Sequence, residues 1–222
     1  MVLFLAFREH VVHIDSFFWE MTIAEMCRDK YLGNDLKKEE GSMTKEEKIE
    51  EIRQRARKNF SLGYNCAECV TEAVLSLVDT GLPPAVKKVA TGFGGGIGLF
   101  GDTCGALAGA VMAVSAVHGR ASLPEGTDQK DVAMKSKAQF YGKPGVYRIF
   151  NLVPNRFKAK YGKTLCRELT VPWQGTWLCK EHALYCRDVI TDAAGIAADL
   201  VLSDKDELAA KPFGENVENL KD

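Results

Sequence analysis

A run of apolar and small residues from Thr103 to His118 contains no Asp, Glu, Lys or Arg, and it limits the folds open to this chain. The apolar part of this run is only about half to three-quarters of the roughly 20 residues that a membrane-spanning helix needs. A helix that is apolar on all sides must then be covered by other parts of the protein. A glycine-rich loop, 92–101, leads into it. The sequence therefore predicts a buried central helix that follows a glycine-rich loop, with no membrane insertion.

Helix signals lie on both sides of this central segment. Thr44 and Glu47 form a capping-box pattern, and apolar residues then recur at helical spacing until Gly63. Asn65, with Glu68 three residues later, predicts the start of a second helix that ends near residue 79. Further helices are predicted over 83–91, 128–141, 146–161 with a break near Pro154, and 179–202, while 164–177 is predicted to be turns and loop.

The sequence has neither a series of alternating strand patterns nor a strand–helix repeat, which disfavours a sheet-based fold. The predicted fold class is all-α, a compact helical bundle. We expect a distinct N-terminal extension over 1–42, a cysteine-rich helical redox domain over 43–205, and a polar C-terminal tail over 206–222. Two interpretations of the extension stand: translation begins at Met43, or the extension is a helical arm that packs on the core or on a partner.

Charge and cysteine content restrict the function classes. The chain has 29 basic and 30 acidic residues, so no net field attracts nucleic acid or an anionic membrane. Its seven cysteines are an odd number, and no cleavable signal is recognised before them. In a reducing compartment, cysteines at this density more often serve metal binding or catalysis than structural bridges. We expect a cytoplasmic protein whose chemistry lies in its cysteines.

Gly96, Gly98 and Gly101 match the spacing of a dinucleotide-binding fingerprint. That fingerprint has meaning only after a buried strand and within a βαβ unit, whereas residues 85–91 have the pattern of a short helix. The loop also lacks the lysine and hydroxyl pair of a phosphate-binding P-loop. We therefore interpret the glycines as a means of close approach to the backbone rather than as a nucleotide site.

Two cysteines lie at predicted helix starts. Cys104 follows Asp102, a plausible N-cap, and Cys66 follows the N-cap Asn65. Free backbone N–H groups and the helix dipole favour a thiolate there, and the thiolate both attacks disulfides and binds metals. Cys69 forms a CxxC with Cys66 on roughly one helical face, a weak signal when it stands alone. Cys66, Cys104 and Cys69 are the candidate redox thiols.

The remaining cysteines lie nearer the C-terminus or in the extension. Cys179, His182 and Cys186 fall at i, i+3 and i+7 of the last predicted helix, so they share a face. His182 is a possible ligand there, with an exposed or core histidine as the favoured alternative. Cys166 precedes Arg167, whose charge would help to hold a thiolate. Cys27 belongs to the extension and is assigned no role.

The combined pattern resembles the C_GCAxxG_C_C family of redox-active proteins, over roughly residues 44–202. The residues that carry the resemblance are Gly63, Asn65, Cys66 and Ala67, then Gly94, Gly95 and Gly96, then Cys104, Gly105, Ala106 and Gly109, then Cys166 with Glu168, Leu169 and Thr170, and finally Cys186. The glycine loop running into the CGAxxG segment is the most specific part of this match.

The resemblance implies four signature cysteines, Cys66, Cys104, Cys166 and Cys186, as the candidate ligands of a cofactor or metal. A related domain is the non-haem domain of split-Soret cytochromes, in which an iron–sulfur centre is suspected. This chain has no CxxCH haem-attachment sequence, so we predict no covalent haem. Cys69 and Cys179 are additions to the signature. The family implies a redox partner protein but no particular enzymatic reaction.

Three hypotheses use these cysteines. In the first, the four signature cysteines bind an iron–sulfur cluster for electron transfer. In the second, two of them, or one with Cys69, cycle between thiol and disulfide. In the third, the same four sulfurs form a structural zinc site. Cysteines that merely fill a helical core are the alternative to all three. A homodimer is the default expectation for a soluble oligomer.

Overall fold

The computed structural model describes residues 43–214 and residue 217. Contacts divide the chain into two units, 1–42 and 43–222, and the fold is that of the second unit. The predictions for the N-terminal extension, including its Cys27 and the choice between a start at Met43 and a helical arm, lie outside the described residues.

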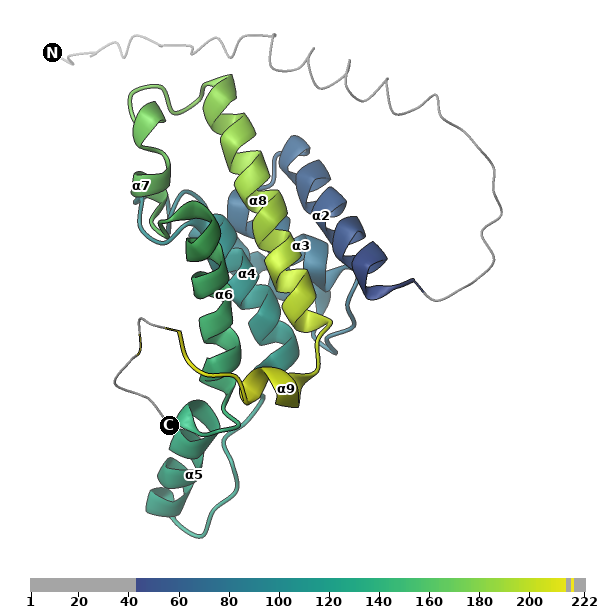
Figure 1. Cartoon of the computed structure of the whole chain (residues 1–222), viewed down its shortest axis with the longest axis vertical. Helices are drawn as coiled ribbons and strands as arrows, with labels where there is room; N and C mark the ends of the chain where they lie inside the picture. The colour runs from purple at the N-terminus through teal and green to yellow at the C-terminus, as the bar shows by residue number, and fades with distance from the viewer. Residues whose placement is uncertain (1–42, 215–216, 218–222) are drawn as a thin grey trace, which may run out of the picture. The chain divides into compact units, whose positions relative to one another are not determined.

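The described residues form helices and loops, with one isolated antiparallel β-bridge between Thr103 and Leu165. This confirms the all-α fold class. In chain order the elements are α2 (Lys45–Ser61), α3 (Cys66–Leu75), the 3-10 helix η2 (Pro84–Phe93), α4 (Gly105–His118), α5 (Gln129–Tyr141), α6 (Val146–Tyr161), α7 (Cys166–Leu169), the 3-10 helix η3 (Val171–Trp173), α8 (Lys180–Val201) and α9 (Lys205–Ala209) (Figure 1).

The core forms where α3, α4 and α8 pack against one another, with α2 against α8 and α6 against α4 (Figure 1). These faces are rich in alanine, which lets the helices approach closely; the buried alanines are Ala67, Ala73, Ala106, Ala110, Ala113, Ala193, Ala194, Ala197 and Ala198. Larger side chains such as Phe157, Ile149 and Ile190 fill the space between the helix pairs and have no exposed surface. By contrast, α5 contacts α6 and buries none of its side chains.

Helix α4 is the buried central helix that the sequence predicts. A methyl group added at Gly109 would lie only 2.5 Å from the carbonyl oxygen of Ala67, so α3 and α4 are in backbone contact at this point. None of the helices in the described part of the chain combines the length and the apolar content that a membrane span requires.

Helix boundaries that depend on local caps agree with the sequence. The Thr44 hydroxyl accepts from the Glu47 amide, and the Glu47 carboxylate accepts from the Thr44 amide, so the predicted capping box starts α2. Asn65 forms the same reciprocal pair with Glu68 at the start of α3. Both helices therefore begin where their capping residues predict.

The predicted break at Pro154 is wrong, because α6 runs through it from Val146 to Tyr161. A proline inside a helix removes one backbone hydrogen bond and costs about 3 kcal/mol. Ile149, Val153 and Phe157 lie on the buried side of the helix and have no exposed surface. Burial of this face offsets the cost of the proline and keeps the helix continuous.

Two other segments are more ordered than expected. Within the stretch predicted as turns and loop, Cys166–Leu169 forms α7 and Val171–Trp173 forms η3. The predicted boundary between the helical domain and the C-terminal tail, at residues 205 and 206, falls inside α9 (Lys205–Ala209). Leu208 in this helix is 2% exposed, and the Ala209 carbonyl accepts from the Gly145 amide.

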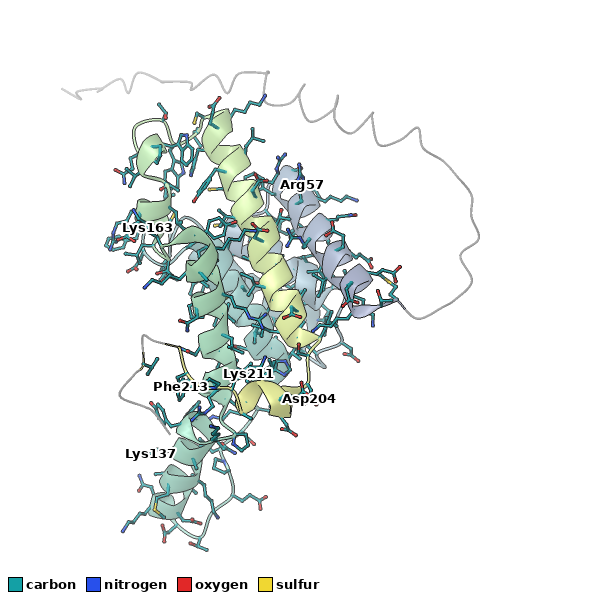
Figure 2. All side chains as sticks on the ribbon, viewed as in Figure 1. Arg57, Lys137, Lys163, Asp204, Lys211 and Phe213 are labelled. Carbon is teal, nitrogen blue, oxygen red and sulfur yellow. The ribbon has the colours of Figure 1, made fainter. Side chains whose placement is uncertain are left out.

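Order continues beyond α9. The Arg148 guanidinium stacks over the Phe213 ring at 4.5 Å and donates to the Lys211 carbonyl. Figure 2 labels Lys211 and Phe213 in the segment that follows α9. The chain following α9 is thus fixed against the start of α6. Residues 205–214 consequently belong to the packed domain.

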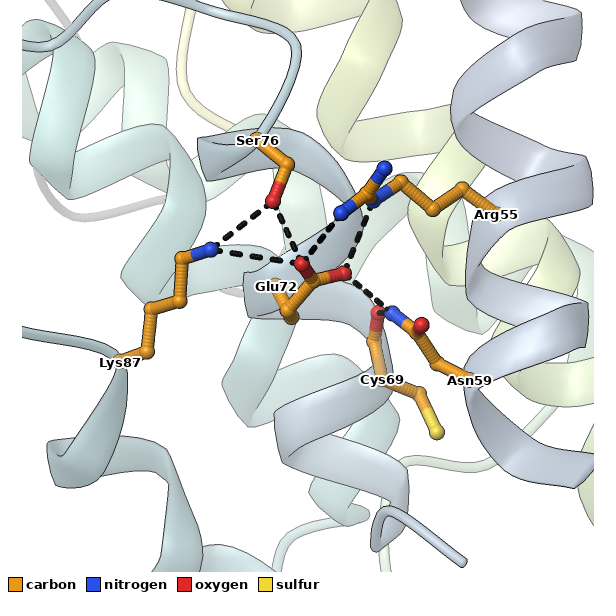
Figure 3. Close-up of polar contacts among 6 residues, drawn as sticks. All are labelled: Arg55, Asn59, Cys69, Glu72, Ser76 and Lys87. Atoms are coloured by element: carbon orange, nitrogen blue, oxygen red, sulfur yellow. Dashed lines mark hydrogen bonds and ion pairs between the residues drawn. The ribbon is translucent and has the colours of Figure 1, made fainter. Parts of the chain in front are cut away.

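One buried carboxylate, that of Glu72, joins α2, α3 and η2 (Figure 3). Arg55 donates to both of its oxygens, at 3.0 and 2.7 Å, and Asn59 donates at 2.5 Å. Ser76 and Lys87 donate at 2.6 and 3.3 Å. Burial by itself raises the pKa of Glu72, but the hydrogen bonds from Arg55, Ser76 and Asn59 outweigh burial and lower that pKa well below its ordinary value.

Replacing Glu72 with glutamine is expected to lower the free energy of unfolding at neutral pH by about 2 kcal/mol, because the variant leaves Arg55 without its carboxylate. In the wild type this stabilisation is fully present above the ordinary pKa of 4.5 and is lost as pH falls below it, since the folded-state pKa is lowered. Urea unfolding at a series of pH values measures both effects. Glu46→Gln, on the exposed first turn of α2, is the control. An E72Q protein with the full acid dependence of the wild type would contradict this account.

Candidate functional site

Cys66 is the first residue of α3, and side-chain contacts fix that helix start against the end of η2. The Asn65 side chain accepts from the amides of Ala67 and Glu68, and its Nδ2 donates to the Thr91 carbonyl at 3.0 Å. The Thr91 hydroxyl in turn donates to the Glu68 carboxylate at 2.6 Å. The capping residues thus hold the Cys66 backbone beside the entrance to the glycine-rich loop.

The loop itself is a left-handed turn. Residues 95–99 all have φ between +60° and +74°, including the non-glycine residues Ile97 and Leu99. Left-handed backbone costs non-glycine residues roughly 1–2 kcal/mol each, so the surrounding contacts must impose it. A methyl group at Gly96 would lie 2.7 Å from both the Asp102 backbone and Cys166 Cβ. The loop follows the 3-10 helix η2, not the strand that a dinucleotide fingerprint requires.

A short antiparallel pairing aligns Cys104 with Cys166. The Cys104 amide donates to the Thr164 carbonyl at 2.8 Å, and the Cys166 amide donates to the Asp102 carbonyl at 2.7 Å. Between these bonds lies the bridge of Thr103 with Leu165. Both cysteines are 7% exposed. Residues far apart in the sequence thus reach the same end of α4 through backbone hydrogen bonds.

Cys186 lies on α8 and contacts His182. The Cys186 sulfur is 3.3 Å from His182 Nε2, and His182 Nδ1 is 2.6 Å from the Trp177 carbonyl oxygen. A carbonyl oxygen can only accept, so Nδ1 carries the hydrogen and Nε2 of the neutral ring accepts from the Cys186 thiol. The His182 ring packs against Trp173 and Trp177, with centroids 5.6 and 4.4 Å away. The histidine is buried, at 6% exposure, and it orients the thiol.

The charge of Cys66 contributes to raising the pKa of each of the other three signature cysteines, so these thiols lie near Cys66. Burial raises the pKa of Cys104 to about 12, and the charges of Cys66 and Cys166 add to the effect. Burial raises the pKa of Cys166 to about 11, with a further contribution from Cys66. The pKa of Cys186 is raised by burial and then by the charges of the other three. Cys66 is the member whose charge reaches all the others.

Positions at helix starts led us to expect lowered pKa values for Cys66 and Cys104, but both pKa values are raised. Burial raises the pKa of Cys66, although nearby backbone N–H groups of Gly95, Ala67 and Ala106 favour the thiolate. Cys104 is itself the N-cap of α4, a position that the sequence assigned to Asp102. The amides of Leu107 and Ala106 favour its thiolate, but burial again has the larger effect. As free thiols, these cysteines are therefore neutral at physiological pH.

The two cysteines outside the signature occupy different surroundings. Cys69 is fully buried, and its thiol donates to the Tyr64 carbonyl at 3.4 Å. Cys179 is the N-cap of α8, and its sulfur accepts from the His182 amide at 3.5 Å. The predicted common face of Cys179, His182 and Cys186 thus gives two separate contacts of His182, one through its amide and one through its ring.

As they stand, the described residues contain no group of three or more His, Cys, Asp or Glu side chains that could hold a metal ion. The cysteines of the described region are free thiols. The signature set nevertheless has the number and the type of donors that an iron–sulfur cluster or zinc takes. Glycine at position 105 also leaves room beside Cys66, since a methyl group there would lie 2.3 Å from its sulfur. The four thiols thus fit an iron–sulfur cluster or zinc by number and type, although their side chains do not form a metal-binding group in this structure.

The sequence placed His182 and Cys186 on one helix face and favoured a core or exposed histidine over a ligand. The structure shows a buried histidine in contact with Cys186, as the four-residue spacing allows. The Trp177 partner of His182 could not be identified in the same way, since the contact uses a backbone carbonyl in a loop. The pairing of residues 102–104 with 164–166 was likewise missed, because so short a bridge has no sequence pattern.

Comparison with known proteins assigns the chain to a family. No curated protein and no solved structure matches the chain. The family model described as "Putative redox-active protein (C_GCAxxG_C_C)" matches residues 64–200, which is more than half of the sequence. The matched range includes all four signature cysteines and His182. The chain therefore belongs to the C_GCAxxG_C_C family.

Proposed function

We propose that Cys66, Cys104, Cys166 and Cys186 bind an iron–sulfur cluster and that the protein transfers electrons. The observation that carries this proposal is the convergence of signature cysteines at the start of α4, where the Thr103–Leu165 bridge aligns Cys104 with Cys166 and a methyl group at Gly105 would lie 2.3 Å from the Cys66 sulfur. Four thiolates are the usual ligand set of such a cluster. The four residues come from the start of α3, the N-cap of α4, the start of α7 and the interior of α8.

The raised thiol pKa values favour metal-bound over free thiolates. A buried thiolate without a counter-charge is unfavourable, and several together repel one another. Iron supplies the positive charge that this site lacks, and binding releases the thiol protons. A free thiol that attacks a disulfide needs a substantial thiolate fraction near neutral pH. The same burial that opposes free thiolates thus supports a cluster over a general dithiol enzyme.

When bound, a cluster supplies one-electron redox chemistry. The protein's own residues would set its potential and its access to water. Backbone amides of Gly95 and Ala106 lie near the Cys66 sulfur, and Trp173 and Trp177 flank the histidine beside Cys186. Amide groups near ligand sulfurs and a low-polarity surrounding are both known determinants of potential.

Zinc is the second candidate for the same sulfurs, since four thiolates also form a structural zinc site. Zinc has no redox chemistry, so the family description as redox-active favours iron and sulfide. A redox partner protein and a reducing, cytoplasmic setting belong to the proposal, because an electron-transfer protein needs a donor and an acceptor and free cysteines persist where disulfides are reduced. A homodimer remains the default expectation.

Anaerobic purification of the full chain, with iron, acid-labile sulfide and zinc analysis and a visible spectrum, tests the proposal. We expect a brown protein with iron and sulfide in stoichiometric amounts and a spectrum that bleaches on reduction. Colourless protein with stoichiometric zinc would replace electron transfer by a structural site. Colourless, metal-free protein that does not take up iron and sulfide under reducing conditions would overturn the proposal in favour of disulfide chemistry.

A further inference from the structure

Cys69 lies beside the candidate site without belonging to its set of four. Its side chain is fully buried, and its thiol donates to the Tyr64 carbonyl. Cys66 is the cysteine whose charge raises the pKa of Cys69, after burial itself; the other charges that raise it are those of Glu68 and Glu72. Cys69 is therefore a neighbour of Cys66 within α3.

Cys66 and Cys69 lie one helical turn apart at the start of α3. Residues three apart on a helix lie on one face, and side chains tilt toward the helix N-terminus. The contact of the Cys69 thiol with the Tyr64 carbonyl shows this tilt, since it reaches a residue that precedes Cys66 in the chain. Cys66 is the first helical residue, so its amide has no hydrogen-bond partner within the helix.

We propose that Cys66 and Cys69 form a reversible disulfide that withdraws Cys66 from the four-cysteine set, so that oxidation of this pair and occupancy of the candidate site exclude each other. The consequence for occupancy rests on the proposed function; the disulfide itself does not. Cys66 therefore has two alternative roles: it is a member of the candidate four-cysteine site, and it is one half of the Cys66–Cys69 CxxC pair.

Access determines the order of the reaction. Cys66 is half-buried whereas Cys69 is fully buried, so a small disulfide such as oxidised glutathione reaches Cys66 first. The thiolate form of Cys66, a small fraction of this partly buried thiol, attacks one glutathione sulfur, forms a mixed disulfide and releases one glutathione thiolate, so the exchange is slower than in a dithiol enzyme. The Cys69 thiolate then attacks the Cys66 sulfur and releases the second. The two protein thiols lose two electrons and two protons, and oxidised glutathione takes up these electrons and protons to become two molecules of reduced glutathione.

Cys104 is a less suitable partner for Cys66. Its backbone amide is bonded to Thr164, and it caps a different helix, α4. A disulfide requires Cβ atoms about 3.5–4.5 Å apart, so a bond between two helices needs both helix starts to fit that spacing. The Cys66–Cys69 bond requires adjustment only within the first turn of α3.

Peptide mapping tests the disulfide directly. Treat the full chain, in wild-type and Cys69→Ser forms, with oxidised glutathione, alkylate the remaining thiols and digest with trypsin. Cys66 and Cys69 fall in one peptide, 59–87, and Cys104 falls in another, 89–120. We expect wild-type peptide 59–87 to be unalkylated and lighter by two hydrogens. Linkage of the two peptides through Cys104, or full alkylation of both Cys66 and Cys69, would overturn the proposal.

Iron uptake tests the consequence. After the same oxidation, the wild type should lose its uptake of iron and sulfide until dithiothreitol restores it, while its peptide 59–87 carries no glutathione. In Cys69→Ser the reaction should stop at the mixed disulfide, so uptake is also lost but peptide 59–87 carries one glutathione on Cys66. Loss of uptake in the wild type with glutathione still attached to Cys66, and no 66–69 bond, would contradict the role of Cys69. If the reduced wild type binds no iron, the proposed function fails, but mapping of the 66–69 bond still decides whether the disulfide forms.

Discussion

Replacing Cys104 with serine is expected to remove bound iron and sulfide while leaving the helical content unchanged. The Cys104 sulfur is 7% exposed and lies within reach of the charges of Cys66 and Cys166. A serine hydroxyl is a poor substitute for a thiolate ligand of iron but is a favourable N-cap, so α4 keeps its start. Metal analysis of the anaerobically purified variant, beside its circular dichroism spectrum, measures both outcomes.

Cys179→Ser is the matched control for this change. Cys179 is also a helix N-cap, at the start of α8, and serine is well suited to accept from the His182 amide there. We expect this variant to retain iron and sulfide at the wild-type level. Equal metal content in Cys104→Ser and the wild type would show that Cys104 is not a ligand. Equal loss of metal in Cys104→Ser and Cys179→Ser would show that any cysteine-to-serine change at a helix N-cap lowers the metal content, whether or not the cysteine is a ligand.

Replacing Gly105 with alanine is expected to destabilise the fold and to disturb Cys66 at the same time. The added methyl group would lie 2.3 Å from the Cys66 sulfur and 2.7 Å from the Phe93 carbonyl oxygen, both shorter than real contacts allow. Alanine is a better helix former by about 1 kcal/mol, but overpacking costs roughly 1–3 kcal/mol or more. We expect a net loss of stability of about 2 kcal/mol in urea unfolding and a lower iron content.

Gly92→Ala provides the comparison, because nothing lies within 4 Å of a methyl group at that position and its backbone is not left-handed. Gly92→Ala should have the same urea midpoint of unfolding as the wild type, within error. If Gly105→Ala also unfolds there and retains its iron, then the space beside the Cys66 sulfur is not needed, and the close approach of α4 to Cys66 has no role in the site.

Local signals predicted most of the fold. Thr44 and Asn65 form the caps that their sequence patterns indicate, and the uncharged run after Cys104 is the buried central helix. These features depend on residues a few positions apart, which the sequence displays directly. The break predicted at Pro154 is wrong because the effect of a proline on a helix also depends on tertiary packing. In α6 the burial of Val153 and Phe157 offsets the local cost of the proline.

The sequence names four cysteines as members of the candidate site, and that membership stays a prediction, but the sequence could not give the sign of their pKa shifts. The helix start at Cys66 favours a thiolate, and only the packed structure shows that burial outweighs it. The contact of Cys186 with His182 had a spacing signal, whereas the carbonyl of Trp177 that fixes the histidine tautomer had none.

The antiparallel pairing of residues 102–104 with 164–166 has a consequence for the order of biogenesis. During synthesis Cys66 and Cys104 are made long before Cys166, and Cys186 follows only with α8. Until α8 packs against α3 and α4, the four thiols have no common location. For the proposed cluster, coordination by all four sulfurs would then come late, on a chain that has already folded. A factor that delivered iron to such a site would have to recognise the finished bundle rather than a nascent segment.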